Sequence, residues 1–156
     1  MTPAQLTALK ADIAADPAFA SLPHNSYGAF AIAAAYNLEA TPAFRVWRSN
    51  VSAQEWRHAI IGGGGATQLD ALTASKRDSL LWAVGESLNP SVAAVRAALD
   101  DFCGSQNTLK AALLLIQKRT ATRLEKLLST GTGSDASPAV MGFEGSVSYP
   151  DIPNWW

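Results

Sequence analysis

The chain has 156 residues and a mass of 16.4 kDa, a length that fits one domain able to bury about two thirds of the surface its unfolded form exposes. Hydrophobic residues make up 48% of it and charged residues only 16%, which favours a compact helical protein with apolar surface left for self-association or a partner. The net charge of −1 excludes a global attraction to nucleic acid or to an anionic membrane.

The remaining composition predicts a soluble chain made in the cytoplasm. The single cysteine, Cys103, excludes an internal disulfide framework and is typical of a reducing compartment. The N-terminal residues lack the basic and apolar regions of a signal peptide, and no stretch approaches the ~20 apolar residues that span a bilayer. We therefore expect no membrane partner.

Two helices are predicted before residue 40. Thr2-Pro3 places a capping hydroxyl and a proline at the start of the first helix, which we expect to run to about Asp16. Asn25-Ser26 caps the second, whose apolar residues continue to about residue 36. Residues 38–49 fit either a short extended piece or a loop held by Trp47, and the sequence leaves both open.

Four more helices are predicted between residues 52 and 117. Ser52 and Glu55 have the spacing of a capping box and open a helix that ends at the glycine run 62–65. A second helix runs from about residue 74 to residue 85, and Asn89-Pro90 caps a third, which ends at Gly104. Asn107 or Thr108 caps the fourth.

The C-terminal part of the sequence changes its pattern twice. Residues 118–128 predict a basic amphipathic helix, and the Ser-, Thr- and Gly-rich segment 129–138 predicts a linker. From residue 140 to 149 the period is two, which predicts a short strand, or a hairpin that turns at Glu144-Gly145. The fold class is therefore mainly α: a bundle of six to seven helices over residues 1–130, followed by an extended, partly β C-terminal arm over 131–156.

Charge is distributed unevenly along this layout. Formal charge is −2 over residues 1–103, +4 over 104–130 and −3 over 131–156. The positive segment predicts a basic face made of Lys110, Lys118, Arg119, Arg123 and Lys126. Such a face can be a solvated surface, a dock for the acidic arm or, in a ring, a contact to DNA phosphates. No aromatic residue interrupts it, which argues against sequence-specific or single-strand binding.

Residue types that carry catalysis are sparse. His24 and His58 are the only histidines, and Glu55 and His58 form a single i, i+3 pair where a carboxylate-bridged metal bundle needs two such pairs and further glutamates. The run Gly62–Gly65 lacks the Gly-Lys-Ser/Thr of a phosphate loop, and Cys103 has no evident base. We expect no catalytic, cofactor-binding or metal-binding residue and no enzyme activity; an enzyme would need His24, His58 and a carboxylate in one cleft.

Several segments resemble a family of small uncharacterised proteins of tailed bacteriophages and prophages. The similarity spans nearly the whole chain and is carried by residues 2–10, Trp47-Arg48, Asn89-Pro90-Ser91, 118–127 with Gly131-Thr132-Gly133, and 143–149. The family implies a virion-associated protein. Among such proteins the layout is similar to that of head–tail connector adaptors, which are small helical proteins with extended C-terminal arms; this second step is an analogy of architecture.

The resemblance implies a structural subunit that forms a homo-oligomeric ring in the neck of the virion and is made in the host cytoplasm during assembly. Its partners would be neighbouring copies and other neck proteins, such as the portal or a tail-side connector, with possible non-specific DNA contact in the channel. The residues expected at protein–protein interfaces are Phe143, Tyr149, Ile152, Trp155 and Trp156. The alternatives are a tail or baseplate accessory protein and a small phage-encoded regulatory binding protein.

Overall fold

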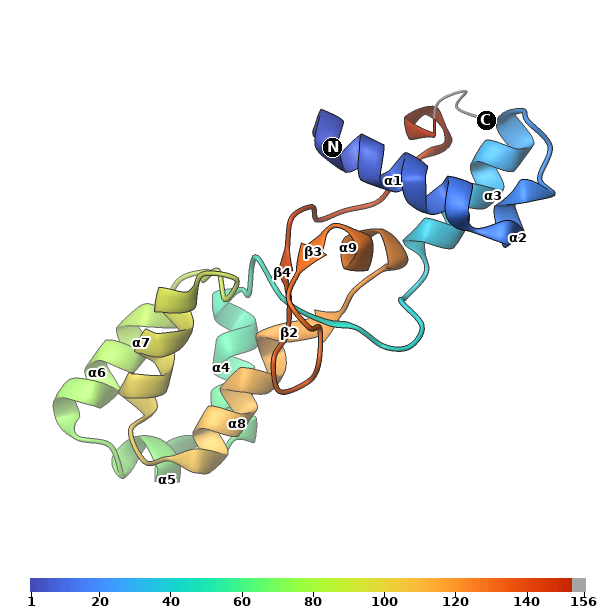
Figure 1. Cartoon of the computed structure of the whole chain (residues 1–156). Coiled ribbons are helices and arrows are strands. Elements are labelled where there is room, and N and C mark those ends of the chain that lie inside the picture. Colours follow the sequence, from blue (N-terminus) through green and yellow to red (C-terminus); the bar gives the residue numbers. More distant parts are fainter. Residues whose placement is uncertain (153–156) are drawn as a thin grey trace. The chain divides into compact units, whose positions relative to one another are not determined.

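The computed structural model describes residues 1–152 and confirms the mainly helical fold class (Figure 1). Within these residues lie nine α-helices: α1 (Pro3–Ala15), α2 (Pro17–Ala20), α3 (Ser26–Asn37), α4 (Ala53–Gly62), α5 (Gly65–Asp70), α6 (Ala74–Ala83), α7 (Ala93–Cys103), α8 (Asn107–Ile116) and α9 (Arg123–Leu127). The strands are β1 (Arg45–Trp47), β2 (Lys118–Thr120), β3 (Ser129–Thr130) and β4 (Val140–Met141), and a 3₁₀ turn covers Tyr149–Asp151.

The strands are short and form two separate two-stranded sheets. One sheet pairs β1 with β2, and the other pairs β3 with β4 in antiparallel register, with Ser129 opposite Met141 and Thr130 opposite Val140. β1 resolves the ambiguous segment 38–49 in favour of a short extended piece.

Helix starts follow the capping signals of the sequence. The side chains of Thr2 and Ser52 each accept a hydrogen bond from the backbone N–H three residues on, and their own backbone N–H groups donate to the side chains of Gln5 and Glu55, so α1 and α4 open with complete capping boxes. Asn25 caps α3 by accepting from two backbone N–H groups. These local bonds explain why α1, α3 and α4 begin where the sequence predicts.

The chain divides into two units, one of them discontinuous. Unit 1 is built from residues 1–46 and the C-terminal part from residue 120 onward, and unit 2 from residues 47–119. The expected bundle over 1–130 and arm over 131–156 do not coincide with this division, because Phe143, Val147 and Ile152 pack with α1, α3 and α9 inside unit 1.

Unit 1 has a core in which early and late segments of the chain meet. Leu9 and Ile13 of α1 and Ile32 and Tyr36 of α3 pack with Leu124 of α9, and Val147 and Ile152 complete the cluster. On α3 the buried residues 29, 32, 33 and 36 follow the i, i+3, i+4, i+7 spacing of one helix face. α3 therefore has one buried and one exposed face.

A second, smaller cluster in unit 1 holds the loop between β3 and β4. Val46, Ala121 and Ala139 are buried together, with Phe44 packed against them. Gly133 has a φ of +66°, and a Cβ there would lie 2.1 Å from the Phe44 ring, so only glycine fits at this point of the loop.

Unit 2 is a helical cluster made of α4 to α8. Its core contains Trp56, Leu80, Leu99, Leu109 and Leu113, all at most 2% exposed. The indole of Trp56 is fully buried, and its Nε1–H donates to the carbonyl of Val51 at 3.1 Å. The indole N–H therefore keeps a hydrogen-bond partner although the ring is buried, and Trp56 is a core residue of unit 2 without an unpaired donor.

Two predicted elements take a different form. Residues 118–128 do not form one helix, because residues 118–120 are extended as β2 and α9 begins at Arg123, where Thr122 and Glu125 form a capping box. The strand predicted over 140–149 is confined to Val140–Met141; its partner is β3, and the connecting turn is the segment predicted to be a linker.

The start of α7 is also later than predicted. Asn89 accepts hydrogen bonds from the backbone and hydroxyl of Ser91, which form a turn of their own, and α7 begins at Ala93 with Val92 at its cap. An unpredicted short helix, α5, follows the glycine run, where Gly64 has a φ of +97°.

Candidate interaction surface

The described part of the C-terminal segment is held against its own unit by backbone and side-chain hydrogen bonds. The side chain of Gln5 donates to the carbonyl of Gly142 at 2.7 Å, and the N–H of Gly142 donates to Leu128 at 3.0 Å. Further on, the side-chain amide of Asn37 donates to the Val147 carbonyl at 2.8 Å and accepts from the Val147 N–H at 2.9 Å. These bonds give residues 142–147 a defined path over α1, α3 and α9.

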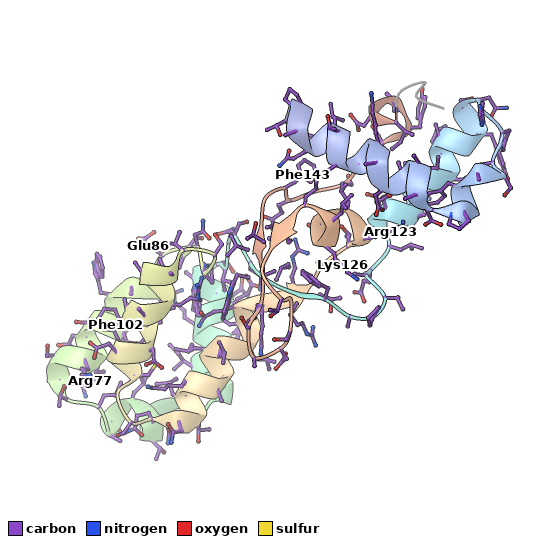
Figure 2. All side chains as sticks on the ribbon, viewed as in Figure 1. Arg77, Glu86, Phe102, Arg123, Lys126 and Phe143 are labelled. Carbon is purple, nitrogen blue, oxygen red and sulfur yellow. The ribbon has the colours of Figure 1, made fainter. Side chains whose placement is uncertain are left out.

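The residues expected at protein–protein interfaces occupy different environments along this path. Ile152 is buried in the core of unit 1, and Phe143 is half-buried and packs against the same core (Figure 2). Tyr149 is 43% exposed. Trp155 and Trp156 lie outside the described residues. The interface role of these five residues stays a prediction, and among the described ones Tyr149 presents the most ring surface to solvent.

Tyr149 stacks on an exposed aromatic residue of α3. Its ring centroid lies 4.3 Å from that of Phe30, with 25° between the ring planes. Phe30 is 55% exposed, and Tyr27, three residues earlier on the same helix face, is 71% exposed. We call Tyr27, Phe30 and Tyr149 the aromatic face. Exposed aromatic rings that sit together are typical of surfaces that bind another protein.

The sequence reasoning missed the α3 part of this face. Phe30 lies off the 29, 32, 33, 36 stripe that is buried, so the apolar spacing of the helix does not by itself show that this ring faces solvent. The spacing from Tyr27 to Phe30 was the available signal, since two aromatics three residues apart on the side opposite a complete apolar stripe face solvent.

Arg123 is the centre of a polar cluster at the start of α9. Its Nη2 lies 3.0 Å from Asp12 Oδ2 and 2.7 Å from Asp16 Oδ2. Its guanidinium carbon lies 4.6 Å from the ring centroid of Tyr36 and 5.1 Å from that of Phe19. Arg123 thereby ties α9 to α1 and α3, and its role in the described structure is to hold unit 1 together.

The ionisation of this cluster follows from its contacts. A hydrogen bond from the Ala18 N–H, helped by Arg123, holds the pKa of Asp16 below its ordinary value. Burial and the hydrogen bond that its hydroxyl donates to Asp12 raise the pKa of Tyr36. Both groups are thus fixed in their usual neutral-pH forms, with Asp16 charged and Tyr36 protonated.

A cleft of about 500 Å³ opens beside this cluster in unit 1. Asp12 and Glu39 supply carboxylates to its lining, and Arg123 and Lys126 supply cations from α9 (Figure 2). Lys126 also lies 5.8 Å from the ring centroid of Phe44. Because both signs of charge line the cleft, it does not present a single-sign surface to an ionic ligand.

The residues of the predicted basic face come from three elements, α8, β2 and α9. Lys110 lies on α8 and pairs with Asp100 at 2.9 Å, and Lys118 and Arg119 belong to β2. Arg123 and Lys126 lie on α9, where Arg123 is engaged by two aspartates. The segment 118–128, predicted to be one helix, is divided between β2 and α9, and the role of the five basic residues stays a prediction.

Among the candidate residues for chemistry, Glu55 and His58 lie on α4, Cys103 is the last residue of α7, and His24 precedes α3 in unit 1. Glu55 bonds to Arg48 at 2.7 Å and to the Ser52 hydroxyl and N–H, which lowers the pKa of Glu55 to about 2. Burial raises the pKa of the Cys103 thiol to about 11. Across residues 1–152, the structure contains no group of three or more His, Cys, Asp and Glu side chains placed to hold a metal ion.

None of the helices in the described part of the chain is both long and apolar enough to cross a bilayer. The chain matches no protein-family model, no curated protein and no solved structure.

Proposed function

We propose that this chain is a structural virion protein of a tailed phage, a head–tail connector subunit that forms a ring in the neck. The observation that carries the proposal is the aromatic face, which places Tyr27, Phe30 and Tyr149 together on the surface of unit 1. The resemblance of the sequence to phage virion-associated proteins supplies the biological setting.

The physical argument is that this face is organised before any partner arrives. Asn37 fixes the segment that leads to Tyr149, and the buried side chain of Ile152 anchors it on the other side. A stacked pair of rings held in this way loses little freedom on binding, so more of the contact energy is retained. Tyr is enriched among residues that dominate interface energies, at about 2 kcal/mol or more each.

In a ring, the aromatic face of each copy would contact a different surface of the next copy, because a head-to-tail contact closes into a ring. The predicted anchors Trp155 and Trp156 follow Ile152 by three and four residues and would extend the same contact. Lys118 and Arg119 on β2 and Lys126 on α9 would meet DNA in the channel or the acidic C-terminal segment of another copy.

The test is site-specific photo-crosslinking in purified virions. A photoreactive phenylalanine analogue replaces Tyr149, and in a matched control it replaces Trp82, which is 80% exposed on α6 of unit 2. We expect position 149 to crosslink to a second copy or to another neck protein, and position 82 to crosslink far less. Crosslinks to tail or baseplate proteins would instead assign the protein to the tail or the baseplate.

A second measurement checks the energetic claim. Phe30→Ala and Tyr149→Ala should each weaken incorporation into particles by about thirtyfold, the equivalent of about 2 kcal/mol, while thermal unfolding of the free protein changes little. The connector proposal fails if the chain is absent from purified particles, or if both variants are incorporated as well as the parent.

A further inference from the structure

α3 carries a second apolar stripe, on the side opposite the one that packs into the core of unit 1. No charged residue occurs in the sequence from Ser26 to Leu38, and the exposed side of the helix is apolar as well. The exposed stripe keeps helical spacing, and its members are Tyr27, Phe30, Ala31, Ala34, Ala35 and Leu38. A helix that is apolar all round is normally covered on every side, so this stripe calls for a second surface.

The stripe and Tyr149, which stacks on Phe30, form a patch large enough for a contact between proteins. An aromatic side chain offers about 200 Å² of surface, so the exposed parts of Tyr27, Phe30 and Tyr149 amount to about 350 Å². With Leu38, which is 67% exposed, and the alanines, the patch reaches about 500 Å², near the upper end of what a monomer exposes. Two such patches together would bury about 1,000 Å², which is the lower limit for a specific protein interface.

The order of large and small residues makes the stripe complementary to a second copy of itself. The rings lie at one end of the helix, and the middle contains only alanine. In an antiparallel pair of α3 helices, with a two-fold axis between residues 32 and 33, the rings of one copy face small or aliphatic side chains of the other. The opposed pairs are then Tyr27 with Leu38, Phe30 with Ala35, and Ala31 with Ala34. A parallel pair would set ring against ring and leave a gap between the alanines.

The antiparallel pair also supplies an occupant for the cleft of unit 1. Ala35 and Leu38 line that cleft, so Tyr27 and Phe30 of the second copy would enter it. The volume of about 500 Å³ lies in the range of pockets that hold drug-sized molecules, so two aromatic side chains fit. Glu39, another lining residue, offers an acceptor for the hydroxyl of Tyr27.

Charge favours the same orientation. Asp151 lies two residues after Tyr149, in the 3₁₀ turn that packs against α3 at the ring end of the stripe. Lys126 lines the cleft at the Leu38 end. An antiparallel pair brings Asp151 of each copy toward Lys126 of the other, whereas a parallel pair brings like charges together.

We propose that the free protein forms a two-fold dimer in which α3 packs antiparallel on α3 and the aromatic rings of each copy occupy the cleft of the other. This dimer goes beyond the connector function. Because Tyr27 and Phe30 cannot contact the second copy and a neighbour in the ring of the virion at the same time, the dimer is the form that precedes assembly.

Sedimentation velocity of the full-length chain over a range of concentrations tests the dimer, and we expect a reversible equilibrium between monomer and dimer. Ala34→Glu places a carboxylate at the centre of the stripe, where the dimer would bury it unpaired, so the dimer should weaken by about a hundredfold or more. Ala97→Glu is the matched control, because Ala97 is also an exposed helical alanine but lies on α7 in unit 2. It should dimerise like the parent.

The orientation is tested with a short bifunctional thiol reagent and two variants, Tyr27→Cys and Leu38→Cys, that carry different affinity tags. We expect crosslinks between copies when the variants are mixed, and far fewer when Tyr27→Cys is treated alone. Cys103 should not compete for the reagent, because it is 1% exposed.

Three results would overturn the proposal. They are a parent chain that stays monomeric at every concentration, a dimer that persists in Ala34→Glu, and crosslinks that form as readily in Tyr27→Cys alone as in the mixture. None of them touches the connector proposal, which is tested in virions. Conversely, a chain that dimerises in solution but is absent from purified particles would keep the dimer and remove the connector.

Discussion

Asn37 and Val147 form a two-bond amide clamp, in which the side chain of Asn37 both donates to and accepts from the backbone of Val147, at 2.8 and 2.9 Å. The two residues are 110 positions apart in sequence, and the clamp joins the end of α3 to the C-terminal segment. A side-chain amide is suited to this role because it offers one acceptor and one donor in the geometry of a backbone peptide.

Asn37→Ala should therefore loosen the C-terminal segment and destabilise unit 1 by about 1–3 kcal/mol, since both backbone groups of Val147 lose their partners. Hydrogen exchange at the Val147 amide measures the first effect, and urea unfolding measures the second. Asn50→Ala is the control, because Asn50 is exposed in unit 2, and it should change neither quantity. Unchanged exchange at Val147 in Asn37→Ala would contradict the clamp.

Arg123→Met should destabilise unit 1 by about 2 kcal/mol, because it leaves Asp12 and Asp16 without their shared cation and removes the contact with two aromatic rings. Lys76→Met is the matched control: its pair with Asp101 is more exposed, so its loss should cost less than about 1 kcal/mol. Chemical denaturation measures the free energy of unfolding of both variants. Equal losses in the two variants would contradict the claim that Arg123 stabilises unit 1 more than an exposed ion pair does.

The stability of unit 2 should depend on Glu55 at acid pH. Its folded-state pKa of about 2 lies below the ordinary value of 4.5, so ionised Glu55 stabilises the folded state above pH 4.5. That contribution is lost as the pH falls from 4.5 through 2. Glu55→Gln should flatten the dependence of the unfolding midpoint on pH across this window. Asp78→Asn, at a highly exposed carboxylate, should leave it unchanged.

Thr122→Ala should cost about 1 kcal/mol by removing the capping hydroxyl of α9. Its Oγ1 accepts from the Glu125 N–H at 3.2 Å, and the Glu125 carboxylate accepts from the Thr122 N–H at 2.9 Å. Thr122→Ser keeps the hydroxyl and should retain most of the stability. A loss in the serine variant as large as in the alanine variant would show that the methyl group, not the cap, matters.

Cys103 should be unreactive toward thiol reagents in the folded protein, because it is 1% exposed and burial raises its pKa to about 11. The rate of reaction with a coloured disulfide reagent at pH 8 should rise by several orders of magnitude in denaturing urea. Fast labelling of the native chain would indicate that α7 opens readily.

Capping signals account for most of what could be predicted from the sequence. Thr2, Asn25 and Ser52 satisfy backbone donors within three residues, so their helices begin as local chemistry dictates. Thr122 and Glu125 also have the spacing of a capping box, but the helical spacing of the apolar residues in 118–128 favoured one longer helix that begins before Thr122. Residues 118–120 are extended because they pair with β1, a long-range contact that no local pattern contains.

The candidate surfaces were only partly predictable for the same reason. Tyr149 was expected to be available to a partner, and it is exposed, but its stacking on Phe30 joins residues far apart in sequence. The spacing of apolar residues indicates which face of a helix is buried, but it does not indicate which other segment of the chain packs against that face.

The discontinuity of unit 1 has a consequence for the order in which the protein is made. The ribosome finishes residue 119, and with it all of unit 2, before it adds Leu124, Val147 and Ile152, which complete the core around α1 and α3. The apolar residues of α1 and α3 therefore stay exposed until Leu124, Val147 and Ile152 have been synthesised, which is after all of unit 2. A chain ended at residue 119 would contain every residue of unit 2 but lack Leu124, Val147 and Ile152, so α1 and α3 would keep their apolar residues exposed.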